Sequence, residues 1–369
     1  MSTQPNTRPP EPNTPPGQEG QRFTSADAAV DELIRLYDIS TRFLCAAFTQ
    51  YLEGSLPGQK HRAFYPEVRF RTSTFDRVDS RLSYGHVDQP GLYTTTITQP
   101  TLFRGYLIHQ LNLLISNHNE PVEIAFSDVP IPLHFALEAG SALAVQRPQQ
   151  ITSHLRDTFD VPDIANVNDY IVNGTQEIEP GLAMPLAPFP AQRIDYSLHR
   201  LVHYTATAPE HYQNYVLFTN YQFYIDEFCR LARDMMSSGD SRYTAFVEPG
   251  NVTTLSGESA SSSGTEPPRQ PQMPSYHLKA GKNKGITLVN IGVGPSNAKT
   301  ITDHIAVLRP HAWLMLGHCA GLRNTQELGD FVLAHAYVRE DKVLDADIPV
   351  WVPIPALAEV QQALESAVA

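Results

Sequence analysis

Two short apolar runs, each followed by a glycine-containing turn, form the clearest pattern in the chain. Residues 286–291 are apolar and rich in β-branched side chains, which is typical of a buried strand. A glycine turn at 292–297 and a helical spacing of apolar residues follow, before a second apolar run, Ala312–Leu316, that ends in residues 317–321. This order predicts a βαβ unit in a mostly parallel sheet, with ligands bound where the strands end.

The residues before this unit continue the same alternation. A short apolar strand at 216–219 precedes a helical pattern, and residues 243–247 predict a further strand. Residues 256–272 are rich in Ser, Gly, Pro and Glu, which is typical of a mobile loop. We interpret this loop as an insertion within one domain, because a strand at 276–278 is placed to pair with residues 286–291. The predicted second domain spans residues 193–369.

The N-terminal half has a different pattern. Residues 1–22 are poor in apolar side chains and predict a disordered tail. A long amphipathic helix follows, with Thr24 as its expected N-cap. Three strands and a helix that starts at Pro100 then predict an α+β domain over residues 23–190. The strands are expected at residues 64–71, 91–98 and 122–126.

Composition excludes several classes of protein. The chain has 27 Lys and Arg against 39 Asp and Glu, so its net charge of −12 argues against a nucleic-acid partner. It has no apolar run long enough to span a bilayer, so we expect no membrane association. Its three scattered cysteines suit a reducing cytoplasm better than a disulfide framework. Because CxxC and HExxH motifs are absent, the sequence predicts no zinc or other metal site.

The first glycine turn resembles two nucleotide-binding motifs without matching either. A P-loop requires glycine before its lysine, where Ala298 stands. A dinucleotide fingerprint requires a third glycine, where Asn297 stands. In the second turn, His318 and Cys319 suggest a nucleophilic pair, but adjacent residues at a strand end point in opposite directions. Taken alone, the turns predict helix-on-sheet packing and a buried, unreactive Cys319.

A run of hydroxyl side chains before the helix expected at Pro100 leaves two interpretations open. The run could hold a phosphate at the helix N-terminus, because free N–H groups and the helix dipole favour anions. Alternatively, the threonines are there because threonine favours strands, and this is the interpretation we prefer from the residues alone. The candidate anion-site residues are Thr94, Thr95, Thr96, Thr98 and Arg104.

Three stretches, residues 93–107, 202–228 and 285–346, together resemble the AMP nucleosidase family. The resemblance extends over residues 25–369, and the second half is similar to the nucleoside phosphorylase superfamily. It implies a fold of class α/β, in which an α+β regulatory domain precedes an incomplete, phosphorylase-like, three-layer α/β domain. It also implies hydrolysis of AMP to adenine and ribose 5-phosphate in purine salvage, with no tightly bound cofactor. Activation by ATP with magnesium, inhibition by phosphate and a homohexamer are implied as well.

The resemblance assigns substrate-binding roles to particular residues. The first glycine turn is implied to line the ribose and phosphate, and the second turn to lie beside the ribose and base. A histidine segment is implied to reach a neighbouring subunit's site, and two residues stand where phosphorylases carry a phosphate-binding loop. In chain order these residues are His203, Tyr204, Asn220, Tyr221, Gly292, Gly294, Pro295, Ser296, His318, Cys319 and Ala320.

Two departures from the family pattern affect the expected chemistry. Met315 stands where phosphorolytic relatives place an arginine on the attacking phosphate, which favours water as the nucleophile. The chain ends at Ala369, before the family's general acid Asp and its ribose-binding Glu, so no catalytic residue is assigned and we expect the chain alone to be inactive. The alternatives are a non-catalytic nucleotide-binding regulatory protein and a purine nucleoside phosphorylase.

Overall fold

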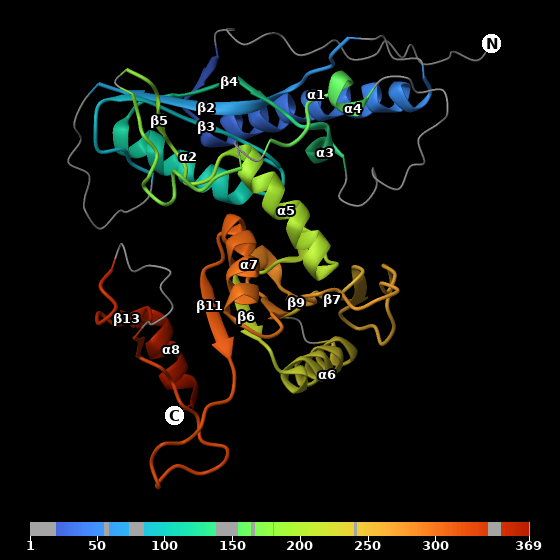
Figure 1. The fold of residues 1–369 in the computed structure, drawn as a ribbon, viewed down its shortest axis with the longest axis vertical. Helices are drawn as coiled ribbons and strands as arrows, with labels where there is room; N and C mark the ends of the chain where they lie inside the picture. The colour runs from blue at the N-terminus through green and yellow to red at the C-terminus, as the bar shows by residue number, and fades with distance from the viewer. Residues whose placement is uncertain are drawn as a thin grey trace. The chain divides into compact units, whose positions relative to one another are not determined.

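The computed structural model describes residues 20–54, 59–73, 85–137, 154–163, 167–179, 181–239, 242–338 and 348–368. The chain forms two units. The first contains residues 1–204, 208–210 and 300–308, and the second contains residues 205–207, 211–299 and 309–369. Each unit has its own β-sheet, and the two are described separately below (Figure 1).

The first unit contains a five-stranded sheet in the order β1-β4-β2-β3-β5. Its strands are β1 Gln21–Phe23, β2 Phe64–Thr72, β3 Gly91–Thr96, β4 Val122–Pro130 and β5 Met184–Pro185. All neighbours pair antiparallel except β3 and β5. Gln21 and Arg22, which the sequence places in a disordered tail, form β1, because pairing with β4 satisfies their backbone whatever their side chains. Residues 1–19 of that tail lie outside the described residues.

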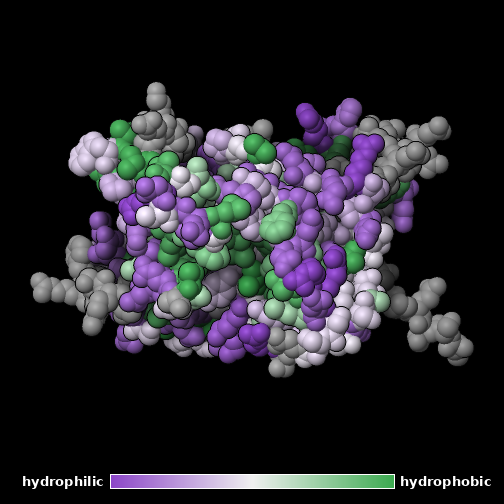
Figure 2. All heavy atoms as spheres, turned by 90° about the horizontal axis from the view of Figure 1, so that it is seen from below, coloured by the Kyte–Doolittle hydropathy of each residue, from purple (hydrophilic) through white to green (hydrophobic). Residues whose placement is uncertain are grey.

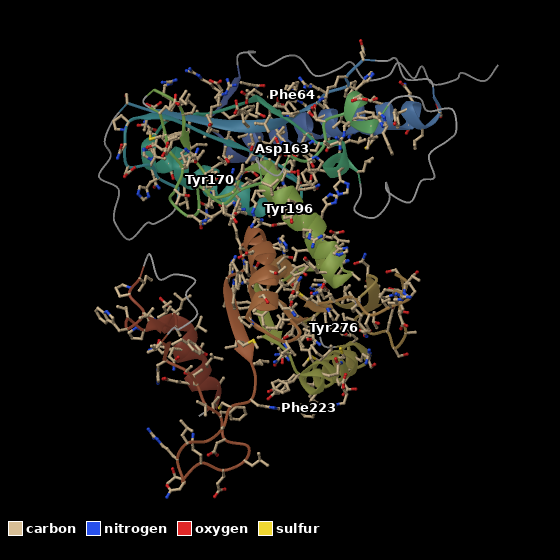
Figure 3. All side chains as sticks on the ribbon, viewed as in Figure 1. Phe64, Asp163, Tyr170, Tyr196, Phe223 and Tyr276 are labelled. Carbon is tan, nitrogen blue, oxygen red and sulfur yellow. The ribbon has the colours of Figure 1, made fainter. Side chains whose placement is uncertain are left out.

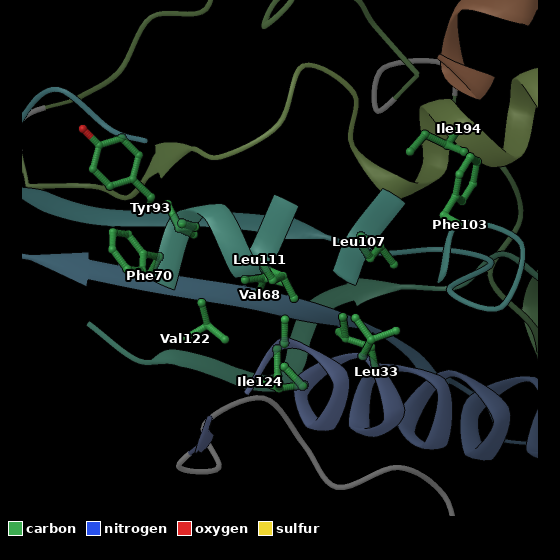
Figure 4. Close-up of a cluster of buried hydrophobic side chains, with 14 of the residues drawn as sticks. Leu33, Val68, Phe70, Tyr93, Phe103, Leu107, Leu111, Val122, Ile124 and Ile194 are labelled. Carbon is green, nitrogen blue, oxygen red and sulfur yellow. The ribbon is translucent and has the colours of Figure 1, made fainter. Parts of the chain in front are cut away.

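Helices α1 (Ala26–Leu52) and α2 (Arg104–His118) cover one face of this sheet. Figure 4 shows side chains of both helices packed against side chains of β2 and β4. Alternate strand residues point to this core, whereas residues between them, such as Glu67 and Arg69, form ion pairs on the other face. The core residues include Leu33, Val68, Phe70, Leu107, Leu111, Val122 and Ile124.

Two helix starts differ from the sequence prediction. The N-cap of α1 is Ser25 rather than Thr24, and its hydroxyl accepts from Ala28 N at 3.4 Å. Helix α2 begins at Arg104 rather than Pro100, because residues 100–103 form a turn in which Phe103 N donates to Gln99 O. Element boundaries of this kind are the least reliable part of a sequence-based prediction.

Three further helices belong to the first unit: α3 (Leu133–Ala136), α4 (Leu155–Thr158) and α5 (Ala191–Thr205). Helix α5 buries Ile194 and Leu198 in the core of the α1–α2 layer. The sequence analysis places this helix in the second domain, which begins there at residue 193. The division of the chain at Tyr204 follows from this packing.

The second unit contains a six-stranded sheet in the order β11-β6-β10-β9-β7-β8. Its strands are β6 Tyr215–Thr219, β7 Ala245–Glu248, β8 Val252–Leu255, β9 Ser275–Lys279, β10 Ile286–Asn290 and β11 Ala312–Leu316. Only β11, β6 and β10 run parallel, so the mostly parallel sheet predicted from the sequence is wrong and the sheet is mixed. Strand β9 is antiparallel to β10 because the six residues between them are too few for a parallel crossover. The predicted pairing of these two strands is confirmed.

Helix α6 (Gln222–Ser238) packs on one face of this sheet through Ile225, Cys229 and Met236. Helix α7 (Pro295–Ile305) follows β10, and a small hairpin, β12 (Ala336–Tyr337) with β13 (Ile354–Pro355), precedes α8 (Ala358–Val368). Residues 256–272 connect β8 to β9, and Ser262 N donates to Thr253 O and Thr265 N to Gly250 O. The mobility expected for this connection stays a prediction. Within the described chain, no helix is long and apolar enough to cross a membrane.

Candidate active site

The three parallel strands of the second unit end at one edge of the sheet. Thr219 of β6 is in register with Asn290 of β10 on one side and with Leu316 of β11 on the other. The glycine turns that follow β10 and β11, and the Asn220–Tyr221 segment that follows β6, therefore lie side by side. Such an edge is the usual ligand site of an α/β sheet.

The first glycine turn is open to close approach. Asn290 Oδ1 accepts a hydrogen bond from Gly292 N at 3.0 Å, which fixes the chain as it leaves β10. Gly292 and Gly294 have φ values of +64° and +100°, a backbone region that side chains disfavour. Within the described chain, no atom lies within 4 Å of the point where a Cβ would sit on Gly294. Pro295 and Ser296 then start α7, and the dipole of a helix favours an anion at its N-terminus.

The second turn places a histidine against two tyrosine rings. The His318 ring centroid lies 4.2 Å from that of Tyr221 and 5.4 Å from that of Tyr224. These tyrosines come from the start of α6, where Phe223 is exposed and labelled in Figure 3. The fold thus brings together His318 and Tyr221, two of the predicted substrate-binding residues. Tyr224 was missed by the sequence analysis, although its position three residues after Tyr221 puts both rings on one helix face.

The rest of the second turn is exposed, including Cys319 and Ala320. The prediction of a buried Cys319 is wrong, because its thiol is exposed. Cys229 is the buried thiol of the unit instead, and burial raises its pKa to about 12. Met315, at the position of the missing arginine, is half exposed on β11 and supplies no positive charge.

Asn220 carries an unsatisfied polar atom at the centre of the edge. Its Oδ1 is buried, and the described residues offer it no hydrogen-bond donor. The next residue is fixed, because Tyr221 N donates to Thr219 Oγ1 at 3.2 Å. A buried acceptor without a donor costs about 1–3 kcal/mol, so such an atom requires an explanation.

His203 and Tyr204 lie in the last turn of α5 and belong to the first unit, so their placement relative to the strand edge is not described. Within that unit, the Tyr204 ring stacks on the His304 ring, with 5.9 Å between their centroids. The Arg200 guanidinium lies over the Tyr204 ring, 4.4 Å from its centroid. Tyr196, labelled in Figure 3, makes an edge contact with the same His304. The predicted contact of His203 and Tyr204 with a neighbouring subunit stays a prediction.

The hydroxyl run proposed as a regulatory anion site is largely occupied by contacts within the first unit. Thr96 Oγ1 accepts from Ala191 N at 3.0 Å, at the start of α5. Thr98 Oγ1 donates to the carboxyl of Asp195 at 2.6 Å. Arg104 forms an ion pair with Asp31 at 2.6 Å. These contacts favour the structural interpretation of the run, and Thr95 Oγ1 also donates to Thr96 O at 3.5 Å.

The sequence analysis missed a buried carboxyl, Asp195 of α5. Tyr65 Oη and Thr98 Oγ1 donate to its two oxygens at 2.6 Å each, and Thr98 Oγ1 also lies 3.2 Å from Tyr37 Oη. Burial raises the pKa of Asp195 to about 7, although both hydrogen bonds oppose the shift. The sequence could have indicated that Asp195 is buried, because its spacing puts it on the same helix face as Ala191 and Leu198.

A separate cavity of about 380 Å³ lies between α6, β7, β8 and the 256–272 connection. Asp226, Arg233, Glu248 and Glu266 line it, and none of the predicted site residues does. Among the described residues, no group of three or more His, Cys, Asp or Glu side chains could hold a metal ion.

Several known proteins are similar to this chain. The family model described as the N-terminus of bacterial AMP nucleoside phosphorylase matches residues 28–183. The AMP nucleosidases of Escherichia coli strain K12 and strain O157:H7 are each 43% identical over 358 residues, covering 95% of this chain and 72% of the relative. A solved AMP nucleosidase from Bacteroides thetaiotaomicron VPI-5482 matches at 24% identity and a TM-score of 0.35, over 47% of this chain and 61% of that one.

Proposed function

The chain belongs to the AMP nucleosidase family, and on that premise we propose that it hydrolyses the N-glycosidic bond of AMP. The products are adenine and ribose 5-phosphate. The similarity to relatives named for this reaction, which extends along nearly the whole chain, is the observation that carries the proposal. The edge formed by β10, β6 and β11 supports it, because it offers an open turn, a helix N-terminus and an aromatic cluster in one place.

The proposed binding mode follows the geometry of this edge. The 5′-phosphate lies at the start of α7, where Gly294 admits close approach of the backbone and the helix N-terminus favours the negative charge. His318, held against Tyr221, contacts the sugar. As the C1′–N9 bond breaks, its electron pair leaves with adenine, so the base must receive a proton. We assign no described residue as that general acid.

Regulation is proposed from the family alone. Mg-ATP activates, phosphate inhibits and the chain assembles as a homohexamer, with effectors bound by the first unit. Of the candidate anion-site residues, Thr94 has the hydroxyl that an effector could most readily reach, because Thr95, Thr96, Thr98 and Arg104 make contacts within the first unit.

The experiment that tests the reaction is product analysis with and without phosphate. In a full-length enzyme that contains this chain, AMP is expected to give adenine and ribose 5-phosphate at rates that do not require added phosphate, because Met315 brings no cation to hold a phosphate nucleophile. Chromatography of base and sugar products checks this. A ribose 1,5-bisphosphate that appears only with phosphate would establish a phosphorylase instead, and AMP binding without any adenine release would favour the non-catalytic alternative.

A further inference from the structure

The inference concerns the cavity of about 380 Å³ between α6, β7, β8 and the 256–272 connection. Tyr276 of β9, labelled in Figure 3, lies on the face of the sheet that α6 covers and lines this cavity. Small-molecule sites in proteins have volumes of about 300–1,000 Å³, so the space suits an organic molecule better than a single ion. One side of it is a face of α6, whose lining residues are three or four positions apart: Gln222, Asp226, Cys229 and Arg233.

The outer wall of the cavity is held in place by close backbone packing. A Cβ on Gly250 would lie 1.9 Å from Thr265 O, and a Cβ on Gly264 would lie 2.2 Å from Asn251 O. Both glycines also have positive φ values, +82° and +86°, so other residues are disfavoured at either position. Thr265 N donates to Gly250 O at 3.1 Å. The 256–272 connection is therefore fixed against the turn between β7 and β8.

Tyr276 has a buried side chain whose hydroxyl lacks a partner among the described residues. The residue is 6% exposed, and no described group forms a hydrogen bond with its Oη. That oxygen is not one of the fully enclosed unpartnered atoms, so it keeps accessible surface. Asp226, Arg233 and Glu248 act electrostatically on the phenol and line the same cavity, which is where the hydroxyl therefore points. Burial raises the pKa of Tyr276 to about 12, so this hydroxyl is protonated at neutral pH.

The charged residues of the cavity favour a cation. Asp226, Glu248 and Glu266 line it together with a single cationic side chain, Arg233. Arg233 forms an ion pair with Glu248 at 2.5 Å, whereas neither Asp226 nor Glu266 has a cationic partner among the described residues. Two negative charges are thus unbalanced, and a phosphate or a nucleotide would be repelled.

We propose that this cavity binds an aliphatic diamine, a site that does not depend on the proposed hydrolysis. Its two ammonium groups balance the charges of Asp226 and Glu266, and one of them also donates to Tyr276 Oη. Its hydrocarbon chain lies against the apolar part of the lining. These apolar residues are Ile225, Pro249, Val252, Pro267 and Pro271.

Isothermal titration calorimetry with putrescine (1,4-diaminobutane) tests the proposal on the purified chain. One putrescine is expected to bind per chain, in buffer with enough salt to screen the exposed surface charges. Butylamine, which has the same chain and one ammonium group, is expected to bind at least about tenfold more weakly, because a charge-assisted hydrogen bond is lost. The neutral 1,4-butanediol should give no binding heat.

Matched variants separate this site from general attraction of cations to a chain of net charge −12. Glu266→Gln is expected to weaken putrescine binding at least about tenfold. Glu258→Gln changes the net charge equally, at an exposed position of the same connection that does not line the cavity, and should bind as the wild type does. Tyr276→Phe removes only the hydroxyl and is expected to weaken binding at least about fivefold. Tyr215→Phe, at an exposed tyrosine of β6, is its control.

The contrary outcomes are equally specific. Absence of saturable putrescine binding to the folded wild type would overturn the proposal. Equal affinities of Glu266→Gln and Glu258→Gln would show diffuse attraction and would overturn it too. Melting temperatures confirm that the variants fold, and Glu266→Gln decides the matter if Tyr276→Phe does not, because Glu266 is exposed.

A crystal structure with putrescine locates the ligand directly. Density for an amine nitrogen is expected within about 3.2 Å of Tyr276 Oη. Putrescine bound elsewhere on the chain, with this cavity holding only water, would overturn the proposal.

Discussion

At the scale of single residues, His318 is the side chain whose surroundings most favour a ligand contact. It is exposed, yet two tyrosine rings restrict its orientation. His318→Ala is expected to lower kcat/KM for AMP at least about tenfold, or about 1.4 kcal/mol, because a placed contact to the sugar is lost. The melting temperature should change little, since an exposed ring contributes little to packing.

Thermal melts and steady-state rates of the same preparation check this expectation. Glu359→Ala, at an exposed position of α8, is a suitable control. A large drop in melting temperature with normal activity per folded molecule would mean that His318 only braces the turn.

Cys319 gives a second test at this scale, and it requires no turnover. Its thiol is exposed, whereas Cys229 is buried and its pKa is raised to about 12. A maleimide should therefore modify Cys319 well before Cys229, because the thiolate reacts and needs access. AMP should slow the labelling of Cys319, because the second turn is a proposed contact of the ribose.

Peptide mass spectrometry of partially labelled protein measures both rates. Protection of Cys319 by AMP but not by inosine at equal concentration would support a site that needs the 5′-phosphate. Equal labelling with and without AMP would remove the second turn from the proposed site.

At the scale of elements, helix α5 is held to the first unit by polar contacts as well as by apolar packing. The first N–H group of α5 donates to Thr96 Oγ1. Asp195 accepts hydrogen bonds from a hydroxyl of β2 and from one in the residues after β3. A carboxyl that accepts two hydrogen bonds inside an apolar core fixes both the rotation and the register of the helix. The hydroxyl run therefore has a structural role that its sequence alone did not reveal.

Asp195 makes the stability of the first unit depend on pH. Burial raises the pKa of Asp195 from about 3.9 in the unfolded chain to about 7, so the folded state binds a proton more tightly. The resulting stability is fully present below about pH 4 and is lost as the pH rises through about 7, with an upper limit of about 4 kcal/mol. Asp195→Asn, which stays neutral, is expected to lose this dependence and to gain stability relative to the wild type between pH 5 and 8.

Urea denaturation at several pH values measures this difference. Asp88→Asn, at an exposed position before β3, is the matched control and should leave the wild-type profile unchanged. The free energy of unfolding of the wild type could instead rise between pH 5 and 8, or Asp195→Asn could leave its pH dependence unaltered. Either result would show that this carboxyl is ionised in the folded protein.

At the scale of the whole molecule, exposed apolar side chains in the second unit are consistent with assembly. Figure 2 shows hydrophobic residues interspersed with polar ones over the face it displays. Large apolar side chains are exposed on β11 and in the residues after it, among them Trp313, Met315, Leu322, Phe331 and Trp351. Exposed apolar surface of this kind marks interaction sites.

Light scattering on the purified chain tests the proposed homohexamer. The expected mass is six times the 41.0 kDa of one chain, and raised salt should not dissociate the assembly if apolar contacts hold it. A monomer at micromolar concentration would contradict the proposal and leave the exposed side chains of the second unit for another partner.

The sequence by itself determined the local elements and the family. Apolar runs and helical spacing located β10, α7 and β11 closely, because period and turn residues act over a few positions. The resemblance to the family assigned the two glycine turns and His318 to the proposed substrate site, whereas the motifs alone predicted only helix-on-sheet packing. The pairing of β9 with β10 was also predictable, since the short turn between them leaves few other arrangements.

The tertiary structure decided what depends on contacts between distant residues. It placed β6 between β10 and β11, which puts Asn220 at the centre of the strand edge, and it brought Tyr221 and Tyr224 against His318. It left Cys319 exposed and made Asp195 a buried acid. Burial and partner choice are set by packing across many residues, whereas periodicity reports only which side of its own element a residue faces.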